Sequence, residues 1–261
     1  MVEGERLEGA SVMENVERLR VLGAPVDAAS FAQALDVVCR LAKDHSQTNF
    51  VVAVNPEKVM AARRDELVAK FLDDSALALP DGIGVVMASK IFYGKKLERV
   101  PGADLSQAIC AESGRRGVKI FFYGAQEDVN AGAVEELRRR YPDVLIVGRR
   151  NGYVKPEEFD ALTDEINASG ADILFLALGS PKQEKWMNEY GAKLNVGVCM
   201  GIGGTLDTIV GKVKRAPKAW QKIHLEWFYR LARQPSRFWR QRNVFIFAFK
   251  VLCAKAFGRV R

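Results

Sequence analysis

The fold is decided by one stretch, Leu176-Ala177-Leu178-Gly179-Ser180-Pro181-Lys182-Gln183-Glu184-Lys185-Trp186. It completes an apolar run, residues 173–178, that is typical of a buried strand, and it continues into a polar segment that opens a helix. Gly179 relieves the backbone at the turn, and Pro181 suits a helix start because its missing N–H costs nothing there. Since amides at a helix start can face phosphate oxygens, Lys182 and Gln183 are candidate binding residues for an anionic ligand. The same pattern also occurs as plain scaffold.

Strand-like and helix-like segments alternate on both sides of this stretch. Apolar runs predict buried strands at residues 50–54, 76–79, 118–123, 144–147, 173–178 and 196–200. Amphipathic stretches predict helices at residues 30–43, 104–116, 127–141 and 156–169. This alternation predicts an α/β fold, a Rossmann-like and mostly parallel sheet with helices on both faces. The chain has 261 residues, 48% of them hydrophobic, which is enough for one large core.

The pattern changes after Gly211, where helix-like stretches broken by prolines follow with no further strand signal. We therefore expect a Rossmann-like domain at residues 1–211 and a C-terminal appendage at residues 212–261. The appendage holds 14 Lys or Arg and a single acidic residue, Glu226, so it carries +13 while the rest of the chain carries −6 of the total +7. Its many aromatic residues, interleaved with these cations, suit the boundary between lipid headgroups and acyl chains.

These features predict a helical, membrane-associating appendage on an anionic membrane surface. The apolar piece at residues 244–249 is followed by Lys250 and Lys255, so it is too short and too charged to span a bilayer. Nucleic acid is the alternative partner of a basic, aromatic segment. Apolar residues of the appendage can also pair subunits, which makes a homo-oligomer a further alternative.

Polar or glycine residues follow several predicted strands, where ligands bind in parallel sheets. We expect one crevice formed by the following residues: Asn55, Asp81, Gly124, Gln183 and Asp207. Asp81 is a candidate general base, and Gly82 beside it lets backbone and ligand approach closely. The alternatives are structural, because Pro-Asp-Gly is also a turn signal and Asn55 can cap the helix that follows it.

Cations and glycines add to this candidate site. Arg99 precedes a glycine turn and a helix start, which suits a diphosphate leaving group, although surface arginines without a role are common. Gly203 belongs to a second glycine-rich strand exit that ends in Asp207, whose carboxylate can bind ribose hydroxyls. In the appendage, the arginines that can neutralise phosphate or bind anionic lipid are Arg230, Arg237 and Arg240.

Several enzyme classes lack their motifs here. Gly82-Ile83-Gly84 lacks the third glycine of a dinucleotide fingerprint, and there is no Walker lysine motif, which disfavours an oxidoreductase or a nucleotide-dependent epimerase. No G-x-S-x-G motif supports a serine hydrolase. The four cysteines form no C-x-x-C pair, and no D-x-D triplet could hold a metal on a sugar nucleotide. We expect neither a metal nor a cofactor, and the absence of a signal-peptide pattern favours the cytoplasm.

These motifs, taken together and in this order, resemble the WecG/TagA/CpsF glycosyltransferase family. The matching stretches are Asn55, Pro80-Asp81-Gly82-Ile83-Gly84, Arg99, Leu178-Gly179-Ser180-Pro181-Lys182-Gln183-Glu184, Gly201-Ile202-Gly203-Gly204-Thr205-Leu206-Asp207, Arg215-Ala216-Pro217 and Glu226-Trp227. The resemblance implies an inverting, metal-independent transfer of a sugar from a UDP donor to a polyprenyl-diphosphate-linked acceptor, in synthesis of the bacterial envelope or exopolysaccharide. It also implies a peripheral enzyme on the inner face of the cell membrane, and no nucleic acid.

The same resemblance implies that Asp81 is the catalytic base. It also implies that Arg99, Gln183 and the appendage arginines hold the sugar and the diphosphate in the active site. Known members transfer N-acetylmannosamine, or its uronic acid, to undecaprenyl-diphosphate N-acetylglucosamine, and others transfer glucose. Two departures leave the donor and acceptor open: Ala53 stands where the family's first strand end usually has Thr, and Leu206 where Phe usually precedes the final Asp. The alternative is a UDP-glucose-type hexosyltransferase acting on a lipid-linked oligosaccharide.

Overall fold

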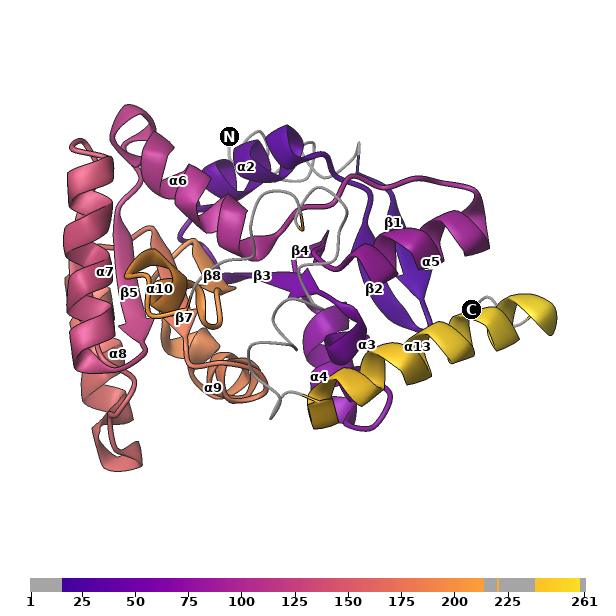
Figure 1. The fold of residues 1–261 in the computed structure, drawn as a ribbon. Coiled ribbons are helices and arrows are strands. Elements are labelled where there is room, and N and C mark those ends of the chain that lie inside the picture. The colour runs from indigo at the N-terminus through magenta and orange to yellow at the C-terminus, as the bar shows by residue number, and fades with distance from the viewer. Residues whose placement is uncertain (1–15, 214–219, 221–237, 259–261) are drawn as a thin grey trace, which may run out of the picture.

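The computed structural model describes residues 16–213, 220 and 238–258, and its centre is a six-stranded sheet (Figure 1). The strands lie in the order β4 (Leu77–Pro80), β3 (Asn49–Val54), β8 (Val198–Gly201), β7 (Ile173–Ala177), β5 (Ile120–Gly124) and β6 (Ile146–Arg150). Every neighbouring pair is parallel. Each strand overlaps one of the six that the sequence predicts, so the α/β fold class is confirmed.

Helices cover both faces of the sheet because side chains along each strand alternate between two cores. In β5, Phe121 and Tyr123 belong to one core, and Ile120 and Phe122 to the other. The first core includes residues of α3 (Pro56–Ala62), α4 (Glu66–Asp73), α5 (Ile83–Tyr93), α8 (Phe159–Ala168), α9 (Lys182–Tyr190) and α13 (Phe238–Ala256). The second includes residues of α2 (Phe31–Leu41), α6 (Gly102–Arg116), α7 (Glu127–Arg140) and α10 (Thr205–Ile209). Two short 3₁₀ turns, η1 (Pro156–Glu158) and η2 (Gly191–Lys193), complete the described elements.

The chain leaves adjacent strands β3 and β8 toward opposite faces of the sheet. Helix α3, which follows β3, packs in the first core, whereas α10, which follows β8, packs in the second. Such a switch opens a crevice at the carboxyl ends of the strands, and ligands of open α/β sheets bind there. The neighbours β7 and β5 show the same change of face, since α9 packs in the first core and α7 in the second. The fold therefore marks the carboxyl ends of the strands from β3 to β5 as the place of a ligand site.

A two-stranded hairpin precedes the sheet, and sequence patterning does not predict it. Strand β1 (Arg18–Val21) pairs with β2 (Ala24–Asp27) in antiparallel fashion. Leu22 and Gly23 make the turn with φ angles of 52° and 93°. Strand β1 alternates between exposed arginines and buried apolar residues, but β2 is buried throughout, and each strand has only four residues.

The last helix of the predicted appendage docks on the rest of the protein. Phe247 and Val251 of α13 are 2% and 3% exposed and belong to the first core. Helix α13 lies beside α3, and Asn243 accepts a hydrogen bond from Arg64 at 3.2 Å (Figure 1). The division at residues 211 and 212 stays a prediction, since the structure does not describe residues 214–219 and 221–237.

At the amino ends of β5 and β7, a nearly buried carboxylate joins three segments. Asp172 accepts hydrogen bonds from Lys43 Nζ at 2.9 Å, from the Lys119 amide at 2.7 Å and contacts His45 Nε2 at 3.1 Å. Burial by itself would raise the pKa of Asp172. These hydrogen bonds and the charge of Lys43 lower the pKa by more than burial raises it, so the net shift is downward. A lowered pKa means that ionised Asp172 stabilises the folded state.

We expect Asp172→Asn to lower the free energy of unfolding by about 1–3 kcal/mol at pH 7, because hydrogen bonds to a charged group are lost. The loss should shrink as the pH falls below about 4, the ordinary pKa of Asp, and vanish below the lowered folded-state pKa, since the wild-type carboxyl is then protonated too. Urea denaturation of both proteins between pH 7 and pH 3 measures this. An Asp172→Asn effect that does not change across this range would contradict it.

Candidate functional site

The ends of β3 and β4 bring Asn55 and Asp81 together. The Asp81 amide donates to the Val54 carbonyl at 3.0 Å, and Val54 lies opposite Pro80 in the register of the two strands. A Cβ atom on Gly82 would lie 2.7 Å from Pro56 Cδ and 3.2 Å from Asn55 Cβ, so only glycine fits there. Asp81 and Asn55 are both half-buried. The two strand ends thus form one surface.

Asn55 also has the structural role that its position allows. Its Oδ1 accepts the Lys58 amide at 2.9 Å and caps α3. The capping interpretation is therefore confirmed, and contact of Asn55 with a ligand stays a prediction.

The segment after α5 crosses the same strand ends. The Val100 amide donates to the Pro80 carbonyl at 2.9 Å, which holds the half-buried Arg99 next to the end of β4. A Cβ atom on Gly102 would lie 3.1 Å from Ala53 Cβ and 3.5 Å from Met200 Cε. Residues 99–102 therefore run over β4, β3 and β8 in turn, and the backbone at Arg99 lies next to the strand end that holds Asp81.

Gln183 reaches the crevice from α9, where its side chain is 3% exposed. A Cβ atom on Gly201 would lie 2.2 Å from Gln183 Nε2, so the amide rests directly on the end of β8. Strands β4 and β8 are two positions apart, which separates their backbones by roughly 10 Å. Lys182, the neighbouring residue, is exposed.

The exit of β8 adds Gly203 and Asp207. Gly203 has a φ of 52°, and no atom would lie within 4 Å of a Cβ placed on it. Asp207 is half-buried in the first turn of α10. Both follow the carboxyl end of β8, and their contact with a ligand stays a prediction.

Gly124 has a packing reason that is independent of any ligand. Its φ is 127°, and a Cβ there would lie 2.5 Å from the Ala177 carbonyl carbon. Its own carbonyl accepts a hydrogen bond from Asn130 Nδ2 at 2.8 Å. The close approach of β5 and β7 thus requires this glycine, and the predicted substrate contact is not tested.

The predicted contribution of the appendage arginines lies outside what the structure describes. Arg230 and Arg237 fall in the residues that are not described, and the side chain of Arg240 is not described either. Their roles stay predictions.

Sequence patterning misses a buried ion pair beside the crevice. Lys58 Nζ lies 2.7 Å from Glu184 Oε1, and the two side chains are 7% and 0% exposed. Burial by itself would raise the pKa of Glu184. The charge and hydrogen bond of Lys58 lower this pKa by more than burial raises it, and they keep the carboxylate ionised. Lys side chains are mostly exposed and are almost never fully buried unless they are paired. The sequence gives no sign of a partner for Lys58, so it predicts an exposed side chain there.

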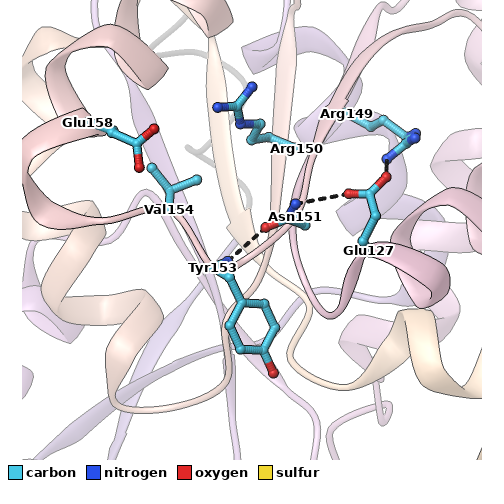
Figure 2. Close-up of a pocket in the computed structure, with 7 residues that line it drawn as sticks. All are labelled: Glu127, Arg149, Arg150, Asn151, Tyr153, Val154 and Glu158. Carbon is cyan, nitrogen blue, oxygen red and sulfur yellow. Dashed lines mark hydrogen bonds and ion pairs between the residues drawn. The ribbon is translucent and has the colours of Figure 1, made fainter.

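A second missed feature is a cavity of about 410 Å³ near the end of β6 (Figure 2). Its lining residues are Glu127, Arg149, Arg150, Asn151, Tyr153, Val154 and Glu158. Arg149 Nη1 and Asn151 Nδ2 hold the two oxygens of Glu127 at 2.7 and 2.9 Å, and Asn151 Oδ1 accepts the Tyr153 amide at 2.9 Å. Hydrogen bonds from Asn151 and Arg149 lower the pKa of Glu127. Tyr153 is 72% exposed.

The loop that carries Tyr153 leans from the sheet edge toward the crevice. A Cβ on Gly152 would lie 3.1 Å from the Ala125 amide nitrogen and 3.1 Å from a methyl of Leu178. Leu178 immediately precedes the turn that leads to Lys182 and Gln183. The cavity and the crevice are therefore neighbours along the carboxyl edge of the sheet. The polar composition of residues 149–158 gives no sign of a hollow.

The described residues hold neither a cluster of metal ligands nor a helix that could span a membrane. Within residues 16–213, 220 and 238–258, no group of three or more His, Cys, Asp or Glu side chains could hold a metal ion. Over the same part of the chain, no helix is long and apolar enough to cross a bilayer.

The parallel sheet with helices on both faces defines a Rossmann-like α/β protein, and ligands of such sheets bind at the carboxyl ends of the strands, where Asn55 and Asp81 follow β3 and β4. The family model of the glycosyl transferases of the WecG/TagA/CpsF family matches residues 19–261, and the chain belongs to this family. It is therefore a glycosyltransferase of a family that makes cell-envelope polymers.

Proposed function

We propose that this glycosyltransferase moves N-acetylmannosamine from a UDP donor to an undecaprenyl-diphosphate-linked acceptor, with inversion and without a metal. The observation that carries the proposal is the contact of the Asp81–Gly82 turn with Asn55 and Pro56, with Arg99 beside it. These contacts support a site in which the Asp81 carboxylate and the Arg99 guanidinium act on the same ligand. The metal-independent form rests on the sequence, which lacks a D-x-D triplet.

In the proposed reaction, Asp81 takes the proton of the acceptor hydroxyl as its oxygen attacks the anomeric carbon. The bond from that carbon to the diphosphate breaks on the opposite side, and UDP leaves with the bonding electrons. Positioned cations and donors stabilise the negative charge that develops on the leaving group. Arg99 would be one such cation, since the Val100 amide next to it donates to the Pro80 carbonyl at the end of β4, and the appendage arginines would add to it.

The donor would extend along the carboxyl edge of the sheet. Its sugar would lie over β3 and β8, and its nucleoside would lie toward the cavity of Figure 2, where an exposed tyrosine ring and Arg150 can meet a base and a phosphate. Strands β8 and β6 are three positions apart, about 14 Å, so an extended nucleotide sugar is needed to connect these places.

The experiment is turnover with a panel of UDP-sugars and lipid-diphosphate acceptors. Release of UDP with UDP-N-acetylmannosamine and a lipid-linked N-acetylglucosamine acceptor would support the proposal. Faster release with UDP-glucose and a lipid-linked oligosaccharide would favour the alternative hexosyltransferase. No release with any pair, from a protein shown to be folded, would contradict both.

We further propose that the enzyme works as a peripheral protein on the cytoplasmic face of the membrane. One side of α13 supports this, since its exposed apolar residues are Phe245, Phe249 and Leu252, with exposures of 59%, 68% and 62%, and Phe257 just after the helix is 77% exposed. Phe247 and Val251 on the other side are buried in the core. Exposed aromatic residues interleaved with Lys250 and Lys255 suit an anionic lipid surface.

We expect the double substitution Phe249→Ser and Leu252→Ser to weaken binding to anionic vesicles about 10- to 100-fold, because each side chain loses apolar area that lipid would bury. Vesicle sedimentation measures this. The matched control is Leu145→Ser with Val147→Ser, which removes two side chains that are 37% and 38% exposed near β6 and should change nothing. Unchanged vesicle binding of the α13 variant would contradict the proposal. A gel shift with nucleic acid would favour the alternative partner, and a monomeric variant of an oligomeric wild type would assign this face to subunit pairing.

A further inference from the structure

The buried ion pair of Lys58 and Glu184 joins two helices across the carboxyl end of β8. Lys58 lies in the first turn of α3, which follows β3, and Glu184 lies in the first turn of α9, which follows β7. Strand β8 lies between β3 and β7 in the sheet. The 2.7 Å contact between the two side chains therefore connects the strand-to-helix turns on either side of the crevice.

Stability does not by itself explain this pair. Removing two charges from water offsets most of their mutual attraction, and an apolar pair of similar size often supports a fold equally well. Buried charge pairs are retained in some proteins because they fix one arrangement of the groups around them. The backbone amide of Lys58 donates a hydrogen bond to Asn55, and Glu184 accepts one from its neighbour Gln183. The pair therefore contacts two candidate site residues.

Glu184 also determines how the amide of Gln183 is oriented. Gln183 Nε2 donates to Glu184 Oε1 at 3.3 Å. An ionised carboxylate only accepts hydrogen bonds, so the amide nitrogen must face Glu184 and the carbonyl oxygen Oε1 must face elsewhere. The amide cannot move toward the sheet, because it already rests on Gly201.

The carbonyl oxygen of Gln183 has no hydrogen-bond partner within the part of the chain that the structure describes. The side chain is 3% exposed, so water does not freely satisfy this acceptor. A buried acceptor without a donor is costly, and each such atom in a folded protein calls for an explanation. An acceptor held at the end of β8, where the crevice opens, matches a ligand that supplies an O–H or N–H group.

We propose that Lys58 and Glu184 are positioning residues that hold the Gln183 amide so that its Oε1 accepts a hydrogen bond from a hydroxyl or N–H group of the bound donor sugar. The inference rests on the proposed function for the identity of the ligand. The orientation of the amide is a separate statement, and it can be tested without turnover.

The kinetic test replaces both charges with apolar side chains of similar length, Lys58→Met with Glu184→Met. We expect kcat/KM for the UDP-sugar to fall about 10- to 100-fold, because a misplaced contact near the reacting group has effects of this size. In a Gln183→Met background the same pair of substitutions should have almost no further effect, since residues that act through one another are not additive. Equal losses with and without Gln183, or wild-type kcat/KM in the Met pair, would overturn the proposal.

The second test reads the amide directly by NMR. The side-chain NH₂ signals of Gln183, identified by their absence in Gln183→Met, should be protected from exchange in the wild type and should lose protection in the Met pair. Unchanged protection would overturn the proposal even if activity fell. If the wild type showed this protection but turned over no UDP-sugar, the proposed function would fail while the positioning of the amide stood.

Two further variants guard against trivial outcomes. If the Met pair does not fold, Glu184→Gln keeps the shape of the side chain at position 184 and allows the Gln183 amide group to rotate. This variant should give the same loss of protection and of kcat/KM. The control is Lys193→Met with Asp160→Asn, an exposed pair whose charged atoms lie 2.6 Å apart, and its kinetics should match the wild type. A loss in the control as large as that in the Met pair would show that the effect is general and would overturn the proposal.

Discussion

The Asp81→Asn enzyme is expected to turn over about 10²- to 10⁴-fold more slowly than the wild type, which is the usual size of a general-base contribution. Asparagine keeps the shape of the side chain but cannot take a proton from the acceptor hydroxyl. The turn itself should survive, because it is held by the backbone hydrogen bond from the Asp81 amide to Val54 and by the contact of Gly82 with Pro56. The loss should therefore appear in kcat, with the KM for the donor little changed.

UDP release under saturating donor and acceptor measures this effect. Asp164→Asn is a suitable control, since Asp164 is exposed on α8, away from the crevice, and should keep wild-type turnover. An Asp81→Asn enzyme with full activity would remove the base assignment, and a large rise in KM at constant kcat would make Asp81 a binding residue instead.

The second large effect concerns stability at the hairpin. Asp27→Ala is expected to lower the free energy of unfolding by about 2–4 kcal/mol, because it removes one partner from a buried charge and hydrogen-bond network. Asp27 is fully buried, and it accepts hydrogen bonds from Arg18 at 2.7 and 2.8 Å and from the Ala78 amide of β4 at 2.6 Å. The carboxylate of Asp27 also raises the pKa of Arg18 through its hydrogen bond.

Without Asp27, the Ala78 amide would be left buried and unpaired at the edge of the sheet that carries Asp81. Urea denaturation measures the loss. Asp73→Ala is the matched control, because Asp73 pairs with Arg20 in solvent, and such exposed pairs contribute about 0–1 kcal/mol. Equal losses from the two substitutions would contradict the assignment of Asp27 as the anchor between hairpin and sheet.

The sequence predicts the sheet well because every strand except the edge strand β6 is a continuous apolar run over most of its length. Strands of this kind are buried on both faces, and they stand out against the amphipathic helices between them. The ends of the strands are less certain: residues 144–147 are predicted as a strand, whereas β6 runs on to Arg150. The run becomes polar there, because β6 is an edge strand whose last residues line the cavity.

The candidate site is predictable where it depends on strand ends, since topology alone gathers them. Asn55 and Asp81 follow the carboxyl ends of β3 and β4, and the Gln183 amide rests on the end of β8, while the binding of a ligand by these residues stays a prediction. Lys58 and Glu184 are not predictable in this way, because a charged side chain near a helix start is typically solvated, and only tertiary packing buries this pair. The cavity beside Tyr153 depends on how a loop folds back onto Gly124 and Leu178, which no local pattern encodes.

The most direct test of the whole account is the structure of the protein with a bound UDP-sugar. We expect the anomeric carbon of the bound sugar to lie over the ends of β3 and β8, between the carboxylate of Asp81 and the carbonyl oxygen of Gln183. The uridine should lie toward Tyr153. A donor bound with its diphosphate away from Asp81 and Arg99, for example at the amino ends of the strands, would contradict it.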